Sequence, residues 1–335
     1  MSEAAPRAAR YSVLIAAFNA AATLPATLDS ALAQTLPEWE AIVVDDGSSD
    51  DTPTIARAYA ESDARIRFVS QDNRGCAGAR NTAAELARAP YLCVLDADDE
   101  YRPEYLASMD RFIHGHPGCA VYSCNPLFRD DSGELVPFRP DLYPRAEASL
   151  TLAEMIAADR IFTCAVVDAE AFRAAGGYTE DSYVENYDLW LRLLAAGGTH
   201  AHNPEHLAVY GLLGERMTDR EEKQVDAAAE ALRRLAAKES LPAETRRAAS
   251  ESAAALSRRA RSLRGADARH AFEARLAAGD FAHARRDYRG TRDGFAHGSR
   301  YLLGLALVTL SPRLLAWALR RAGDSGDPSV TGIRA

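Results

Sequence analysis

The sequence predicts an α/β fold: a Rossmann-like, mostly parallel sheet with helices on both faces, followed by a C-terminal helical region. Two observations lead to it. Short apolar runs alternate with helical patterns through the first hundred residues, as in strand–helix–strand units with parallel strands. Two of these runs end in aspartates, Asp45 with Asp46 and Asp96 with Asp98. The carboxyl ends of such strands face the ligand crevice of an open α/β sheet, so we expect the aspartates to meet there.

Each element has a local reason. Apolar runs predict strands over 11–17, 39–44, 65–70 and 91–95. Leu24, Leu28 and Leu32 recur at helical spacing within 23–34, where Pro25 sits near the helix start, a position that tolerates proline. Further helices are expected over 50–60 and 75–88. Beyond residue 103 the alternation loosens, and we expect helices over 103–113, 150–158 and 187–196, strands over 120–127 and 161–167, and turns at 130–134 and 176–177.

Composition excludes several classes of protein. The chain has 335 residues, 47% hydrophobic and 26% charged, which is typical of a globular protein. A net charge of −9 argues against nucleic acid as the main partner. The five cysteines form no C-x-x-C pair, which favours reduced thiols and a cytoplasmic protein over a zinc site. Residues 1–10 lack a signal-peptide pattern and are expected to form a disordered tail.

The C-terminal third has a different character. Ala, Arg and Glu dominate from about residue 216, and we expect a helical accessory region over 216–322, with a helix–turn–helix pair at 272–288 and a flexible tail over 323–335. The stretch 301–319 is apolar, and residues 281–321 hold eight Arg and two Asp. Such a segment fits an interfacial helix on the inner face of the cell membrane, or equally a helix pair packed on the domain.

Clustered carboxylates at strand ends need a positive partner. A hard divalent cation that itself holds a diphosphate meets this need, because such ions take one or two protein carboxylates plus substrate phosphates. A lone D-x-D is a weak motif, since an acidic turn after a strand is often only a solvated loop. Two such turns in the first hundred residues make a metal–nucleotide site the favoured interpretation.

The same residues carry a family resemblance. The ordered segments that carry it are Ser12–Asn19, Leu28–Thr35, Val43–Asp50, Gly75–Asn81, Leu95–Asp99 and Glu185–Arg192. Together they resemble a family 2 glycosyltransferase over about residues 11–215. The resemblance implies a GT-A domain and a transfer of sugar from a nucleotide diphosphate with inversion. The donor it favours is a UDP-sugar, and the cofactor it implies is Mn²⁺ or Mg²⁺. It implies a glycan or lipid-linked acceptor, as in cell-surface glycan or polysaccharide assembly.

The resemblance also assigns donor-side roles. Ala16 and Phe18 would lie at the nucleotide base, and Asp46 would accept a hydrogen bond from it. Asp96 would contact the ribose or a metal-bound water. Asp98, in the D-x-D motif, would hold the metal. Arg80 would contact the base or the diphosphate through its planar fork, with an ion pair to the acidic turns as the alternative.

The acceptor side departs from the family pattern. Where the family has Glu-Asp with the aspartate as general base, this chain has Glu185-Asn186, and an amide cannot take a proton at neutral pH. Glu185 and Asp188 are three residues apart and share a helix face. Either can supply the base, and we favour Glu185, with Asp188 as the residue that anchors the helix.

Other functions are compatible with parts of the sequence. A nucleotidyltransferase would want a glycine-rich basic loop after the first strand, which is missing, and a dehydrogenase would want G-x-G-x-x-G. A catalytically impaired nucleotide-sugar-binding or scaffold protein remains an alternative because of Asn186.

Overall fold

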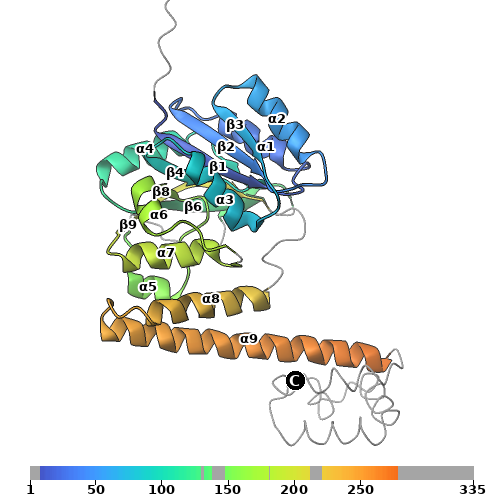
Figure 1. The fold of residues 1–335 in the computed structure, drawn as a ribbon, viewed down its shortest axis with the longest axis vertical. Coiled ribbons are helices and arrows are strands. Elements are labelled where there is room, and N and C mark those ends of the chain that lie inside the picture. The colour runs from blue at the N-terminus through green and yellow to red at the C-terminus, as the bar shows by residue number, and fades with distance from the viewer. Residues whose placement is uncertain (1–7, 130–131, 138–147, 181, 212–220, 278–335) are drawn as a thin grey trace, which may run out of the picture. The chain divides into compact units, whose positions relative to one another are not determined.

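The protein is described by a computed structural model over residues 8–129, 132–137, 148–180, 182–211 and 221–277 (Figure 1). The chain divides into two compact units. One contains the described residues up to 211 together with 230–252, and the other contains 221–229 and 253–277. The first unit carries the sheet and every candidate site residue.

A nine-stranded sheet forms the centre of the first unit, in the order β3-β2-β1-β4-β8-β6-β9-β5, with β7 paired to β6. The strands are β1 Tyr11–Ala17, β2 Trp39–Asp45, β3 Ile66–Ser70, β4 Tyr91–Val94, β5 Glu100–Tyr101, β6 Val121–Arg129, β7 Leu135–Pro137, β8 Val166–Asp168 and β9 His200–Tyr210. The first four run parallel. The other half is mixed, because β8 is antiparallel to β4 and β6, whereas β6 and β9 are parallel. The α/β class is confirmed.

Helices follow the strands as the sequence predicted, with different ends. They are α1 Leu24–Leu32, α2 Thr52–Ser62, α3 Gly75–Leu86, α4 Tyr105–Gly115, α5 Leu152–Ala157, α6 Ala169–Ala174, α7 Glu185–Ala195, α8 Glu221–Ala236 and α9 Ala243–Ala277. α6 was not predicted. It begins where the Asp168 side chain accepts a hydrogen bond from Ala171 N at 2.8 Å, a helix cap that the sequence analysis overlooked.

The parallel half of the sheet fixes the position of α3, which carries the residues most important to the site. β1 and β2 are buried almost throughout, as expected of strands covered on both faces. α3 packs on these two strands through alanines, whose short side chains let the helix lie close to the sheet. Arg80 projects from this helix and is itself buried.

Several predictions for the C-terminal region lie outside the described residues. These are the interfacial segment 301–319, the tail 323–335 and the second half of the pair at 272–288. Residues 272–277 continue α9 rather than starting a new helix. Over the described part of the chain, no helix has the length and apolarity required to cross a membrane.

A buried histidine network joins β6 and β9. Ser123 Oγ lies 2.8 Å from both His200 Nε2 and His202 Nδ1, and Leu150 N donates to His200 Nδ1 at 3.0 Å. Burial, assisted by the neighbouring His202, lowers the pKa of His200 to about 3. His200 is therefore neutral in the folded protein at any physiological pH.

This network predicts loss of stability in acid. Because the folded pKa lies below the usual 6.5, the unfolded chain takes up a proton that the folded chain excludes, so stability falls as pH drops below 6.5. The slope reaches about 1.4 kcal/mol per pH unit for one proton, or about 2 kcal/mol at pH 5. We expect His200→Asn, which keeps an acceptor for Leu150 N, to flatten the dependence of the urea midpoint between pH 7 and pH 5. Exposed His114→Asn serves as the control; a His200 variant with the wild-type pH dependence would contradict this assignment.

Candidate active site

The ends of β1 and β2 form one side of the site. Asp46 N donates to Ala17 O at 2.8 Å, which joins the two strand ends. Ala16 is half-buried at the end of β1. Phe18, directly after the strand, is 52% exposed, the most of any large apolar side chain in the described residues. An exposed aromatic ring beside a polar turn is suited to stack on a planar ligand group.

The two aspartates that end β2 have different partners. Asp45 accepts from Ser48 N at 3.2 Å and from Ser70 Oγ at 3.0 Å, so it holds the turn together. Asp46 Oδ1 accepts from Gln71 Nε2 at 2.7 Å and from Arg74 N at 2.9 Å. These bonds fix the orientation of the Asp46 carboxylate and leave its other oxygen without a partner among the described residues.

The turn after β4 is held from behind by Asp99, which is fully buried. Its Oδ1 accepts from Gly211 N at 2.8 Å and its Oδ2 lies 3.6 Å from Cys164 Sγ, while its carbonyl accepts from Thr27 Oγ1 at 2.8 Å. Burial, with the adjacent carboxylates of Asp96 and Asp98, raises the pKa of Asp99 well above its ordinary value. Asp99 thus secures the turn, in which Asp96 and Asp98 are partly exposed.

Gly211 makes the closest approach to this turn. A Cβ atom at this position would lie 1.7 Å from the Asp98 carbonyl oxygen, far inside the van der Waals contact distance of carbon and oxygen. The end of β9 and the Asp96–Asp99 turn therefore pack backbone against backbone. Only glycine fits at this position.

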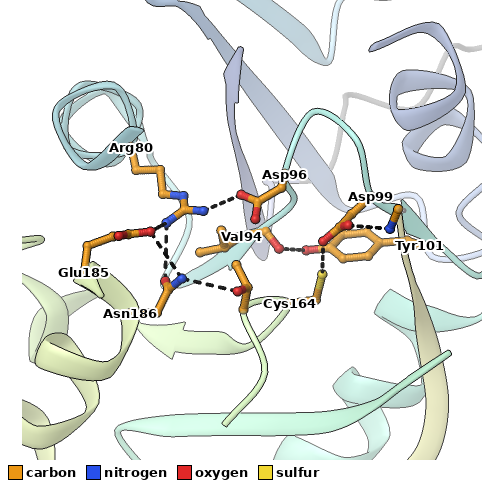
Figure 2. Close-up of polar contacts among 10 residues, drawn as sticks. Arg80, Val94, Asp96, Asp99, Tyr101, Cys164, Glu185 and Asn186 are labelled. Carbon is orange, nitrogen blue, oxygen red and sulfur yellow. Dashed lines mark hydrogen bonds and ion pairs between the residues drawn. The ribbon is translucent and has the colours of Figure 1, made fainter. Parts of the chain in front are cut away.

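Arg80 lies at the centre of the site, between the donor-side turn and the start of α7 (Figure 2). Its Nη2 is ion-paired with Asp96 Oδ1, its Nη1 lies 2.8 Å from Glu185 Oε1, and the same nitrogen is 3.4 Å from Asn186 Oδ1. Burial disfavours the charged guanidinium, but the carboxylates of Asp96 and Glu185 outweigh this cost and raise the pKa of Arg80 above its usual value. The structure thus shows the ion pair that the sequence analysis gave as the alternative for Arg80.

Glu185 and Asn186 face this cluster from the first turn of α7. The Asn186 amide donates to Thr163 Oγ1 at 3.2 Å and to Glu185 Oε1 at 3.5 Å. All contacts of the Glu185 carboxylate therefore go to Oε1, and Oε2 accepts no hydrogen bond from the described residues. The carboxylate keeps one oxygen available for a further partner.

Both carboxylate oxygens of Asp188 accept hydrogen bonds. Its two oxygens accept from Thr179 Oγ1 at 2.6 Å, Arg192 Nε at 2.8 Å and Arg234 Nη2 at 2.8 Å. Burial opposes ionisation here, but the hydrogen bonds from Arg234 and Thr179 and the nearby Arg192 lower the pKa of Asp188. A carboxylate of low pKa whose oxygens already accept several hydrogen bonds is a poor proton acceptor. The geometry therefore favours Glu185 over Asp188 as the candidate general base.

A clamp that the sequence analysis missed joins α3 to the segment before α7. The Asn81 side chain donates to Tyr178 O at 2.9 Å and accepts from Tyr178 N at 2.8 Å. Gly177, at φ +71°, lies so close that a Cβ would come within 2.8 Å of Asn81 Oδ1. Asn81 directly follows Arg80, so one turn of α3 contacts both this turn and α7.

The donor set fits a hard divalent cation. In the described part of the chain, no group of three or more His, Cys, Asp or Glu side chains forms a complete metal cage. Mg²⁺ and similar ions do not require one, because one or two carboxylates suffice when the substrate's phosphates complete the coordination. The Asp98 carboxylate oxygens and the Asp96 oxygen that is not paired with Arg80 are of this kind, and both residues are partly exposed.

Comparison with known proteins agrees with this geometry. The sequence profile of Glycosyl transferase family 2 matches residues 12–175. A putative teichuronic acid biosynthesis glycosyltransferase, TuaG from Bacillus subtilis (strain 168), is 31% identical over 210 residues, covering 62% of this chain and 81% of TuaG. Chondroitin synthase from Escherichia coli is 33% identical over 190 residues, covering 56% of this chain but only 26% of that enzyme.

Solved structures share the fold. S. aureus TarS 1–349 in complex with UDP-GlcNAc superposes with a TM-score of 0.60 at 18% identity, covering 71% of this chain and 69% of TarS. The mannosyltransferase PcManGT from Pyrobaculum calidifontis, in complex with GDP-Man and Mn²⁺, gives 0.56 at 18% identity, covering 95% and 88%. At these identities the likeness concerns the fold alone.

The contact between Gly211 and Asp98 yields a prediction. Gly211→Ala should displace the Asp96–Asp99 turn and destabilise the protein by about 1–3 kcal/mol, as overpacking does. We also expect Mn²⁺ binding, measured by isothermal titration calorimetry, to weaken by at least tenfold. Gly115→Ala is the matched control, because a Cβ there meets nothing within 4 Å. Unchanged Mn²⁺ affinity in Gly211→Ala would show that the turn tolerates the displacement.

Proposed function

The chain belongs to glycosyl transferase family 2, and from this membership we propose that it transfers a sugar from a nucleotide diphosphate to a hydroxyl acceptor, with inversion at the anomeric carbon. The observation that carries the proposal is the pair of carboxylates on either side of Arg80. Asp96 belongs to the donor-side turn and Glu185 to the acceptor-side helix, and each gives one oxygen to the same guanidinium. The second oxygen of each carboxylate has no hydrogen-bond partner among the described residues.

We assign the donor side as the sequence analysis did, except at Arg80. Phe18 and Ala16 would contact the base, and the remaining oxygen of Asp46 would accept a hydrogen bond from it. Asp96 would contact the ribose or a metal-bound water, and Asp98 would hold Mn²⁺ or Mg²⁺. When bound, the ion would neutralise the negative charge that develops on the leaving diphosphate. UDP-GlcNAc in TarS supports a UDP-sugar as the first donor to test, and GDP-Man in PcManGT supports a GDP-sugar as the second.

We assign Glu185 as the general base. The acceptor oxygen forms a bond to the anomeric carbon as the bond from that carbon to the diphosphate oxygen breaks, and the hydroxyl proton passes to Glu185 Oε2. Asn186 keeps Oε1 occupied and orients the carboxylate. Asp188 holds α7 in place through Arg192 and Arg234. The acceptor would be a glycan or lipid-linked hydroxyl, since relatives include enzymes named for teichuronic acid and chondroitin synthesis.

The metal assignment can be tested at Asp98. Asp98→Ala should abolish donor turnover and Mn²⁺-dependent nucleotide binding, with no loss of thermal stability, because the side chain is partly exposed. Turnover is measured as nucleotide release from UDP-GlcNAc or GDP-mannose, with and without EDTA. Asp72→Ala, an exposed aspartate ahead of α3, should behave as wild type. Near-full, EDTA-insensitive activity of Asp98→Ala would refute the metal site.

The base assignment separates Glu185 from Asp188. Glu185→Gln should lower kcat by a factor of roughly 10²–10⁴, the usual size of a general-base contribution, with little change in nucleotide affinity. Asp188→Asn should instead lower the free energy of unfolding, by on the order of 3 kcal/mol for a broken buried ion pair. The reverse pattern, an active Glu185→Gln beside an inactive Asp188→Asn with normal melting, would transfer the role to Asp188.

We further propose that residues 301–319 hold the protein at the inner face of the membrane. The support is in the sequence, where this apolar stretch is flanked by arginines that anionic lipid attracts. Flotation with anionic liposomes should retain the full chain and lose a chain that ends at Gly298. Equal flotation of both would leave this segment without a membrane role.

A further inference from the structure

Arg80 is enclosed by protein. Its side chain is 2% exposed, and its Nε is buried without a hydrogen-bond partner among the described residues. Nη1 donates to Glu185 and Asn186, and Nη2 is ion-paired with Asp96. Because the side chain is almost fully buried, its remaining N–H groups are shielded from a ligand that binds at the protein surface.

The Tyr178 ring helps to fix the orientation of the Arg80 guanidinium plane. The Tyr178 ring lies against the guanidinium, with the ring centroid 5.5 Å from the Arg80 Cζ atom. Tyr178 is fixed in turn by the two backbone hydrogen bonds of Asn81. Because Arg80 and Asn81 are consecutive on α3, the helix that presents the cation also positions the ring that flanks it.

The planar fork sets how the two carboxylates lie. A guanidinium donates along fixed directions, so the bonds to Nη1 and Nη2 determine where the carboxylates of Glu185 and Asp96 can sit relative to one another. With the inner oxygens bound, the outer oxygens are directed away from the guanidinium. The donor-side and acceptor-side groups are thereby held in one spatial relation before any substrate arrives.

We propose that Arg80 is a positioning residue, which aligns Asp96 with Glu185 across the crevice and does not itself contact the donor. The inference rests on the proposed function and deepens it. The proposed role requires the planar guanidinium and not merely a positive charge. A lysine ammonium is a point charge that cannot hold two carboxylates in a set geometry. The role also requires that donor binding survive loss of the fork better than turnover does.

The test compares Arg80→Met and Arg80→Lys with wild type. Binding of UDP in the presence of MnCl₂ is measured by calorimetry, and turnover by nucleotide release from UDP-GlcNAc at saturating donor, with GDP and GDP-mannose as the second pair. We expect Arg80→Met to lower turnover at least 100-fold while the Kd of the nucleotide changes less than threefold. Arg80→Lys should recover part of the activity and remain about tenfold below wild type. Arg67→Met, which removes a partly buried arginine paired with Glu40 away from the site, should leave both values unchanged.

Two results would overturn the proposal. A tenfold or greater rise in nucleotide Kd for Arg80→Met, with turnover at saturating donor near wild type, would make Arg80 a donor contact. Wild-type turnover in Arg80→Lys would show that a positive charge is enough for turnover without the planar guanidinium. This variant therefore tests the proposal even if Arg80→Met does not fold. A wild-type protein that neither binds nor hydrolyses either donor would instead refute the proposed function.

Discussion

A buried guanidinium needs carboxylates around it, and this requirement organises the site. Breaking a buried ion pair by removing one partner costs about 3–5 kcal/mol, because the remaining charge is left in a medium that solvates it poorly. Arg80 obtains its carboxylates from two places, the turn after β4 and the first turn of α7. The acceptor helix is thereby tied to the donor side of the sheet, and the two halves of the crevice come together as one folded unit.

The turn after β4 depends in a similar way on the buried contacts of Asp99. Asp99 reaches Gly211 at the end of β9 and Cys164 in the segment before β8, while α1 binds its carbonyl through Thr27. A buried carboxyl group that accepts these bonds fixes the backbone of the turn. Asp99 is buried, whereas Asp96 and Asp98 in the same turn are partly exposed.

The sequence predicted what depends on local pattern, the parallel strands β1, β2 and β4. Asp46, Asp96 and Asp98 follow two of these strands, and parallel strands bring their carboxyl ends to one edge of the sheet. The pairing of Arg80 with Glu185 joins residues 105 positions apart and depends on how Gly177 and Tyr178 pack against α3. No periodicity encodes that contact. The strand β9 was missed for another reason: its polar residues, among them His200, His202 and Asn203, interrupt the apolar alternation, although all three are buried in the folded protein.

Asn186 changes the electrostatics of the cluster as well as its chemistry. With an aspartate at this position, three carboxylates would surround one buried cation, for a local charge of −2. The amide reduces this to −1, since only Asp96 and Glu185 then oppose Arg80. Repulsion between like charges is strongest where water is excluded, so a neutral side chain at position 186 removes one unfavourable interaction from the cluster. Asn186 therefore leaves Asp96 and Glu185, the residue we propose as the general base, as the two carboxylates that share Arg80.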